Sequence, residues 1–207
     1  MIQLVDLTHP IDNQMPIYPG DLPTRLIKTK TFSQDGFNNY QLESGMHSGT
    51  HLDGPMHLTD QIRPISEFPL ESFFGEGCLL DARDASVINL KDEYRSQVKE
   101  ALIVLIYTGW DCKYGTTEYY DQQPVISSEL ADFLITRKAK IIGMDLPSPD
   151  LHPFRIHKLL LSNNILIVEN LTNLGSLLQV KQFEIMAFPL RIKADSSILR
   201  VVAKINK

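Results

Sequence analysis

The stretch HSGTHLDGPMH, residues 47–57, constrains the fold of this chain more than any other. It places His47, His51, Asp53 and His57 on odd-numbered positions within eleven residues. The chain has only six histidines, so a uniform distribution would put about 0.3 of them in such a window. So many imidazole and carboxylate groups close together require a backbone that directs them to one point.

Neither a regular helix nor a straight strand brings these side chains together. Gly49 and Gly54 disfavour a helix, on which Asp53 would also lie about 240° around from His47. In a straight strand the odd positions share one face, but His47 and His51 would be about 13 Å apart, which is too far for one ion. We therefore expect a strand end that bends at Gly49, so that alternate side chains converge.

The composition of this stretch predicts a divalent metal site. A single histidine is more often a hydrogen-bonded structural residue, but that interpretation would have to hold here several times over. Packing three histidines and an aspartate together without a cation would bury polar groups at a large cost unless each found a partner. Neutral imidazole and carboxylate are common ligands of Zn²⁺, Mn²⁺ and Fe²⁺, so the donor types leave the metal open.

Further ligands are expected elsewhere, because these residues alone leave the coordination shell short. Glu169 ends the apolar run ILIVE, and α/β sheets present functional groups at strand ends. His157 precedes it by twelve residues. Spacing alone is equally consistent with Glu169 as a solvated charge at a strand exit. His9 and His152 both precede a proline and are more typical of turns.

The pattern of apolar and β-branched residues predicts a strand-rich α/β or α+β fold, with residues 1–207 forming one domain. A helix capped by Ser127 is predicted to run to near Lys138, and a second, more polar helix is predicted within residues 89–100. Nine segments have strand character: 2–7, 24–32, 37–46, 77–84, 101–109, 140–146, 164–171, 182–190 and 198–205.

Charge and hydropathy exclude several function classes. The net charge of −5, without a dense Lys/Arg cluster, argues against nucleic acid as a partner. The longest apolar runs, such as residues 101–106, are too short to cross a bilayer, so no membrane partner is expected. Asp6 interrupts the apolar start of the chain, which does not support a secretory signal, and we expect a cytoplasmic protein.

The same stretch resembles the HxGTHxDxPxH signature of the cyclase-like family of metal-dependent hydrolases, which includes bacterial-type kynurenine formamidase and isatin hydrolase. The resemblance extends over the chain through DLTHPIDNQMPIYPGD at 6–21, TGW at 108–110, GMDLPSPD at 143–150 and FPLRIKADSSILRVVA at 188–203. It implies a swivelling β/β/α fold and assembly into homodimers or tetramers.

Carried over position by position, the resemblance implies five ligands for one to two divalent ions per chain: His47, His51, Asp53, His157 and Glu169. The first three would hold one ion, and the last two would complete a second or shared site that both carboxylates bridge. Zn²⁺ is expected first and Mn²⁺ second. His57 would be the acid/base residue. Tyr18 would contact the substrate, at a position that is often Trp in kynurenine formamidases.

The expected reaction is hydrolysis of an amide-type bond in a small molecule by metal-activated water, with an aryl formamide such as N-formylkynurenine or a cyclic amide as substrate. One alternative is a non-haem Fe(II) oxygenase in which His51, Asp53 and His157 form the metal-binding triad. That alternative leaves the remaining histidines and Glu169 unexplained. The other alternative is a non-catalytic binding protein that the metal only stabilises.

Overall fold

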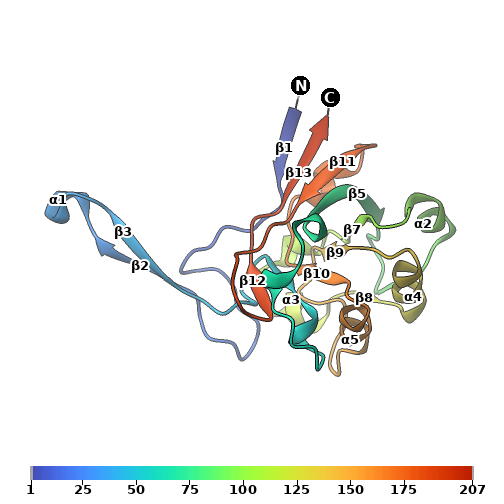
Figure 1. Cartoon of the computed structure of the whole chain (residues 1–207), viewed down its shortest axis with the longest axis horizontal. Helices are drawn as coiled ribbons and strands as arrows, with labels where there is room; N and C mark the ends of the chain where they lie inside the picture. The colour runs from blue at the N-terminus through green and yellow to red at the C-terminus, as the bar shows by residue number, and fades with distance from the viewer. Residues whose placement is uncertain (1, 207) are drawn as a thin grey trace.

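The computed structural model describes residues 2–206, and its main element is a nine-stranded sheet (Figure 1). The strands are β1 (Ile2–Asp6), β4 (His51–Asp53), β5 (Phe74–Asp81), β7 (Ile103–Tyr107), β9 (Ile141–Met144), β10 (Leu166–Glu169), β11 (Phe183–Met186), β12 (Ser196–Ile198) and β13 (Val202–Asn206). Their order across the sheet is β1-β13-β11-β5-β7-β9-β10-β4-β12. The central strands β5, β7, β9 and β10 are parallel, and the outer strands pair antiparallel.

The remaining elements surround this sheet. Two further strand pairs form, β2 (Arg25–Lys30) with β3 (Asn39–Glu43), and β6 (Val87–Ile88) with β8 (Val125–Ile126). The α-helices are α1 (Phe32–Asp35), α2 (Asp92–Gln97), α3 (Thr117–Asp121), α4 (Ser128–Thr136) and α5 (Arg155–Ser162). The 3₁₀ turns are η1 (Pro55–His57), η2 (Ile65–Glu67), η3 (Leu70–Ser72), η4 (Trp110–Lys113) and η5 (Leu174–Leu177). The β2–β3 ribbon projects from the body as an arm with α1 at its tip (Figure 1).

Two hydrophobic cores cover the two faces of the central sheet. Val104 and Ile106 of β7 belong to the core shared with α2, α4 and α5. The alternate residues Ile103 and Leu105 belong to the core on the other face, which includes side chains of β10, β11 and β13. Because β7 is buried on both faces, its sequence is a continuous apolar run and not an alternating one.

The sheet is curled so that its two ends approach each other. Only residues 199–201 separate β12, at one edge, from β13, which lies next to the other edge. At about 3.5 Å per residue, Ile198 and Val202 lie at most about 14 Å apart. The predicted single strand over residues 198–205 is therefore wrong. The chain leaves the ladder after Ile198, and the Val201 carbonyl accepts a hydrogen bond from the Leu7 N–H at 2.9 Å.

The helix predictions are confirmed in part. The Ser127 side chain caps α4 by accepting a hydrogen bond from the Leu130 N–H at 3.2 Å, as expected. The polar helix predicted within residues 89–100 is shorter, because the backbone is already extended at Val98. Helix α5 was not predicted. Over residues 2–206, no helix combines the length and apolar character needed to cross a membrane.

Candidate metal centre

Strand β4 lies between β10 and β12, and this pairing builds the floor of the site. His51 lies opposite Glu169 of β10, and Asp53 lies opposite Ser196 of β12. Because side chains alternate along a strand, His51 and Asp53 project from one face while Leu52 enters the core on the other. The two-residue spacing of the histidine and the aspartate thus places both on one face beside the glutamate.

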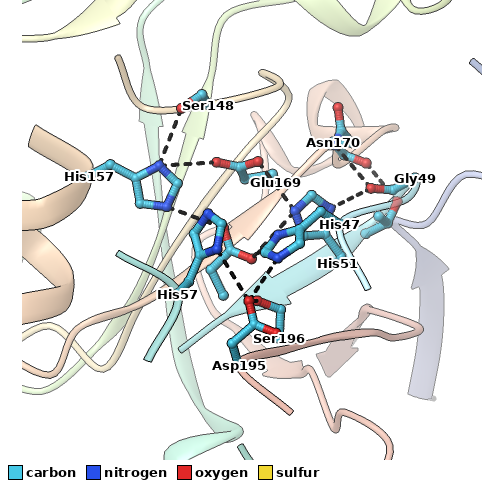
Figure 2. A network of polar contacts seen from close by, with 12 residues as sticks. His47, Gly49, His51, His57, Ser148, His157, Glu169, Asn170, Asp195 and Ser196 are labelled. Atoms are coloured by element: carbon cyan, nitrogen blue, oxygen red, sulfur yellow. Dashed lines mark hydrogen bonds and ion pairs between the residues drawn. The ribbon is translucent and has the colours of Figure 1, made fainter. Parts of the chain in front are cut away.

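The chain bends immediately before β4, which confirms the bend predicted at Gly49. This residue has φ +60, and a Cβ there would lie 2.7 Å from the Met15 Cε. The bend returns His47 toward the strand, so that its Nδ1 lies 2.9 Å from Asp53 Oδ1. The Gly49 carbonyl accepts a hydrogen bond from His51 Nδ1 at 2.8 Å, which leaves His51 Nε2 directed at the carboxylates (Figure 2).

Three buried side chains converge at the centre of the site. His51 Nε2 lies 3.5 Å from Asp53 Oδ1 and 3.3 Å from Glu169 Oε2, and one ligand atom from each residue lies within 4.8 Å of the others. His51 Nε2, Asp53 Oδ1 and Glu169 Oε1 are buried and lack a partner in hydrogen-bonding geometry. Each such atom costs about 1–3 kcal/mol when left unpaired. A cation would satisfy all three, so these donors fit a divalent metal ion.

Helix α5 brings His157 to the same cluster. The His157 N–H donates to Asp150 Oδ1 at 3.3 Å, in the first turn of the helix. Its imidazole Nε2 lies 3.2 Å from Asp53 Oδ2, while Nδ1 lies 3.7 Å from Glu169 Oε1 and 3.3 Å from Ser148 Oγ. The structure thus brings together all five of the residues that the sequence predicted as ligands.

His57 ends the 3₁₀ turn η1 and lies beside the cluster. Its ring centroid is 4.1 Å from that of His47, and its Nδ1 lies 3.2 Å from Asp195 Oδ2. The same oxygen of Asp195 lies 2.9 Å from His47 Nε2 (Figure 2). One carboxylate oxygen therefore contacts both histidines.

Several polar residues around the cluster were not predicted: Ser148, Asp150, Asn170 and Asp195. Asn170 connects the two ligand strands, because its side-chain amide donates to the Gly49 carbonyl at 3.0 Å and its own carbonyl accepts from Thr50 Oγ1 at 2.6 Å. Ser148, Asp150 and Asp195 lie in segments that carried the family resemblance. No spacing in the sequence connects them to the histidines, and the resemblance was not carried to these positions, so they were missed.

The carboxylates of the cluster favour protons on His47, His51 and His157, because they raise the pKa of each imidazole against the effect of burial. Burial opposes protonation of His47, but the Asp53 and Asp195 carboxylates outweigh it and raise the pKa of this imidazole to about 9. Burial also opposes ionisation of Asp53, but the surrounding histidines, His51 foremost, hold its pKa well below the usual range. Burial raises the pKa of Glu169. A divalent cation could replace these protons while the imidazoles bind it in their neutral form.

A cavity of about 250 Å³ lies over the cluster and includes His57 in its wall. Tyr18 lines it, with 39% of its surface exposed and its ring edge-on to Tyr120 at 5.6 Å. Among the described residues that line the cavity, Asp21 adds a carboxylate near the aromatic wall and no Lys or Arg is present. The apolar and aromatic side chains of the lining are Pro16, Tyr18, Leu58, Tyr114, Tyr120, Pro147 and Phe154.

The remaining two histidines lie outside the cluster, as expected. His9 stacks on Tyr114 with ring centroids 3.8 Å apart, and its N–H donates to Thr50 Oγ1 at 3.0 Å. His152 is exposed and its ring lies 5.9 Å from that of Phe154. Neither belongs to a group of side chains that could share a metal ion within residues 2–206.

The curled mixed sheet thus carries a cluster of imidazole and carboxylate groups beneath a small cavity. The family described as "Putative cyclase" matches residues 5–151, and the chain belongs to this family. This result confirms the resemblance and the strand-rich α+β fold class predicted from the sequence.

Individual relatives match along nearly the whole chain. An uncharacterized protein of Methanocaldococcus jannaschii is 34% identical over 204 residues, which cover 98% of this chain and 99% of that protein. The kynurenine formamidase of Bacillus cytotoxicus is 25% identical over 206 residues, covering 97% and 96%. Isatin hydrolase A from Labrenzia aggregata has a similar structure, with a TM-score of 0.86 at 24% identity, covering 100% of this chain and 94% of that one.

Proposed function

We propose that this protein is a metal-dependent hydrolase that cleaves an amide-type bond in a small aryl formamide or cyclic amide. The proposal rests on the buried, unpaired ligand atoms of His51, Asp53 and Glu169, which face one another beneath an aromatic cavity. Relatives named kynurenine formamidase and isatin hydrolase support a hydrolase. In this proposal residues 1–207 act as one hydrolase domain.

Five side chains hold one to two divalent ions in this proposal: His47, His51, Asp53, His157 and Glu169. The two carboxylates lie between the histidines, since Asp53 is close to His47, His51 and His157 and Glu169 is close to His51 and His157. They are therefore placed to bridge two ions or to share one. When bound, Zn²⁺, or Mn²⁺ in its place, supplies Lewis-acid activation of water and of the scissile carbonyl.

His57 moves the proton in this proposal. Its ring lies in the cavity wall, and its Nδ1 contacts Asp195 Oδ2 at 3.2 Å. Nε2 of His57 makes no hydrogen bond to the residues that the structure describes. This nitrogen can take a proton from the attacking water and give it to the leaving nitrogen as the C–N bond breaks, a role typically worth about 10²- to 10⁴-fold in rate.

The cavity favours an uncharged, flat substrate. Its walls are aromatic and apolar, with Tyr18 among them, and apart from the tyrosines its ionisable lining consists of histidines and the carboxylates Asp21, Asp53 and Glu169. A substrate carboxylate held against the aromatic wall, away from a bound ion, would lose its hydration without gaining a Lys or Arg partner. Formanilide-type aryl formamides and isatin-type cyclic amides therefore fit better than N-formylkynurenine, which carries a carboxylate.

A hydrolysis screen under nitrogen tests this proposal. Protein loaded with Zn²⁺ or Mn²⁺ should hydrolyse at least one aryl formamide or cyclic amide without oxygen, with product followed by chromatography. Turnover that requires both Fe²⁺ and oxygen would replace the proposal with the oxygenase alternative. Metal that raises the melting temperature without turnover of any compound would indicate the non-catalytic binding protein.

We also propose that the chain assembles into a homodimer or tetramer through its arm. An isolated two-stranded ribbon is marginally stable in water at best, and residues 25–43 form one that projects from the body (Figure 1). The arm exposes large apolar side chains, which mark interaction surfaces when they cluster: Ile27, Phe32, Phe37, Tyr40 and Leu42. Sedimentation velocity should show an oligomer, and Phe37→Ser with Tyr40→Ser should shift it toward monomer. A monomeric wild type would contradict this proposal.

A further inference from the structure

We propose that Asp195 is a positioning residue that orients both His57 and His47 through a single carboxylate oxygen. Its Oδ2 lies 3.2 Å from His57 Nδ1 and 2.9 Å from His47 Nε2. This inference rests on the proposed function, in which the first histidine moves a proton and the second binds metal. Asp195 itself contacts neither the substrate nor the metal in this assignment.

The contact with His57 fixes which nitrogen of that ring is basic. A carboxylate oxygen accepts hydrogen bonds, so His57 Nδ1 carries the proton when it bonds to Asp195. In the neutral ring, Nε2 then holds the lone pair and is available to a proton in the cavity. Without Asp195 the ring could rotate or exchange tautomers, and the basic nitrogen would no longer be held in place.

The contact with His47 works in the same way on the metal side. His47 donates from Nε2 to Asp195 and presents Nδ1 to Asp53 Oδ1 at 2.9 Å. When a carboxylate accepts a hydrogen bond from one ring nitrogen of a histidine ligand, it fixes the orientation and tautomer of the ring. It also makes the other ring nitrogen a more basic ligand for the metal. Asp195 therefore couples the ligand and the acid/base residue, which have ring centroids 4.1 Å apart.

The backbone around Asp195 holds it against β4. The Gly54 N–H donates to the Asp195 carbonyl at 3.0 Å, and a Cβ at position 54 would lie 2.9 Å from that oxygen. The next residue, Ser196, pairs with Asp53 in the sheet and donates from Oγ to Asp195 Oδ2 at 3.2 Å. The same strand pairing thus positions the metal-binding aspartate and the carboxylate of Asp195.

Nitrogen NMR of the metal-free protein tests the orientation directly, without turnover. Long-range ¹H–¹⁵N correlation of the histidine rings should show neutral His57 as the Nδ1–H tautomer in the wild type. Asp195→Asn should lose this preference, whereas Asp132→Asn, which removes an exposed carboxylate from α4, should keep it. A wild-type His57 in the Nε2–H form would overturn the inference, whatever the variants do.

Metal affinity and kinetics provide the second test. Asp195→Asn should weaken metal binding by about 10- to 100-fold and, at saturating metal, lower kcat by at least ~10-fold with KM within ~2-fold. Asp132→Asn should match the wild type in both. If the wild type hydrolyses nothing, the proposed function is wrong. The effects of Asp195→Asn on metal affinity and on the His57 tautomer still decide whether Asp195 is a positioning residue. Unchanged affinity and an unchanged tautomer in a folded Asp195→Asn protein would overturn the inference.

Discussion

His51 lies directly opposite Glu169 in the antiparallel pairing of β4 with β10, and His51 Nε2 lies 3.3 Å from Glu169 Oε2. The two residues are 118 positions apart in the sequence. Both are buried, so their contact is set by the sheet register and not by a flexible loop. The central part of the proposed metal site is therefore built into the sheet.

Removing the charge of Glu169 should weaken metal binding and activity together. Glu169→Gln keeps the shape of the side chain but offers a poorer ligand than a carboxylate, so metal affinity should fall by at least ~10-fold, the scale on which even supporting residues act. A metal titration gives the affinity, and elemental analysis with a hydrolysis assay on the same sample gives metal content and activity. Glu76→Gln, at an exposed position of β5, is the matched control. Full metal content and full activity in Glu169→Gln would make Glu169 a bystander.

Removing the imidazole of His57 should lower the rate of hydrolysis without lowering metal binding. His57→Ala should keep its fold and metal content but lose at least ~10²-fold in kcat, because no group remains to move the proton. His152→Ala, which removes an exposed histidine, should behave like the wild type. Loss of metal in His57→Ala would instead make His57 a ligand or a support for one.

The bend at Gly49 should be needed for metal binding as well as for stability. Gly49→Ala places a side chain at φ +60, which costs about 1–2 kcal/mol in the left-handed region. Gly36→Ala places the same strain at φ +78 on the arm, where a Cβ would meet nothing within 4 Å. Both variants should unfold at a lower denaturant concentration than the wild type, but only Gly49→Ala should bind metal more weakly than the wild type. Equal metal affinities in the two variants would show that the bend does not position the ligands.

The charge of the cavity should appear in the substrate preference. Formanilide or isatin should have at least ~10-fold higher kcat/KM than N-formylkynurenine, because the carboxylate of the longer substrate would lie against the aromatic wall, away from the bound ion and without a Lys or Arg partner. Asp21→Asn removes a carboxylate from the lining and should reduce the ratio of kcat/KM for formanilide or isatin to kcat/KM for N-formylkynurenine. A clear preference for N-formylkynurenine would contradict the assignment of an uncharged substrate.

The sequence predicted the part of the site that depends on local spacing. His51 and Asp53 share a face because strand side chains alternate, and Gly49 allows the bend because it can adopt a positive φ. The resemblance added His157 and Glu169 before any contact between them was known. All of these residues converge in the structure.

What the sequence could not predict depends on long-range geometry. Asp195 reaches the histidines because β12 pairs with β4, and nothing local to residues 188–203 encodes that partner. The predicted strand over 198–205 is two strands in the structure. In the curled sheet β12 pairs with β4 at one edge, whereas β13 pairs with β1 and β11 near the other edge. Helix α5 was missed although it carries His157, since it is short and begins only after the turn that ends at Phe154.

The metal dependence of hydrolysis can be measured by titrating metal into chelator-stripped protein and following hydrolysis of formanilide or isatin under nitrogen. Activity should be absent without metal, rise in proportion to bound Zn²⁺ or Mn²⁺, and saturate at one to two ions per chain. His51→Ala should neither bind the ion tightly nor recover activity. Full hydrolysis by the stripped protein, or hydrolysis by His51→Ala at the wild-type rate without bound metal, would show that the protein is not a metal-dependent hydrolase.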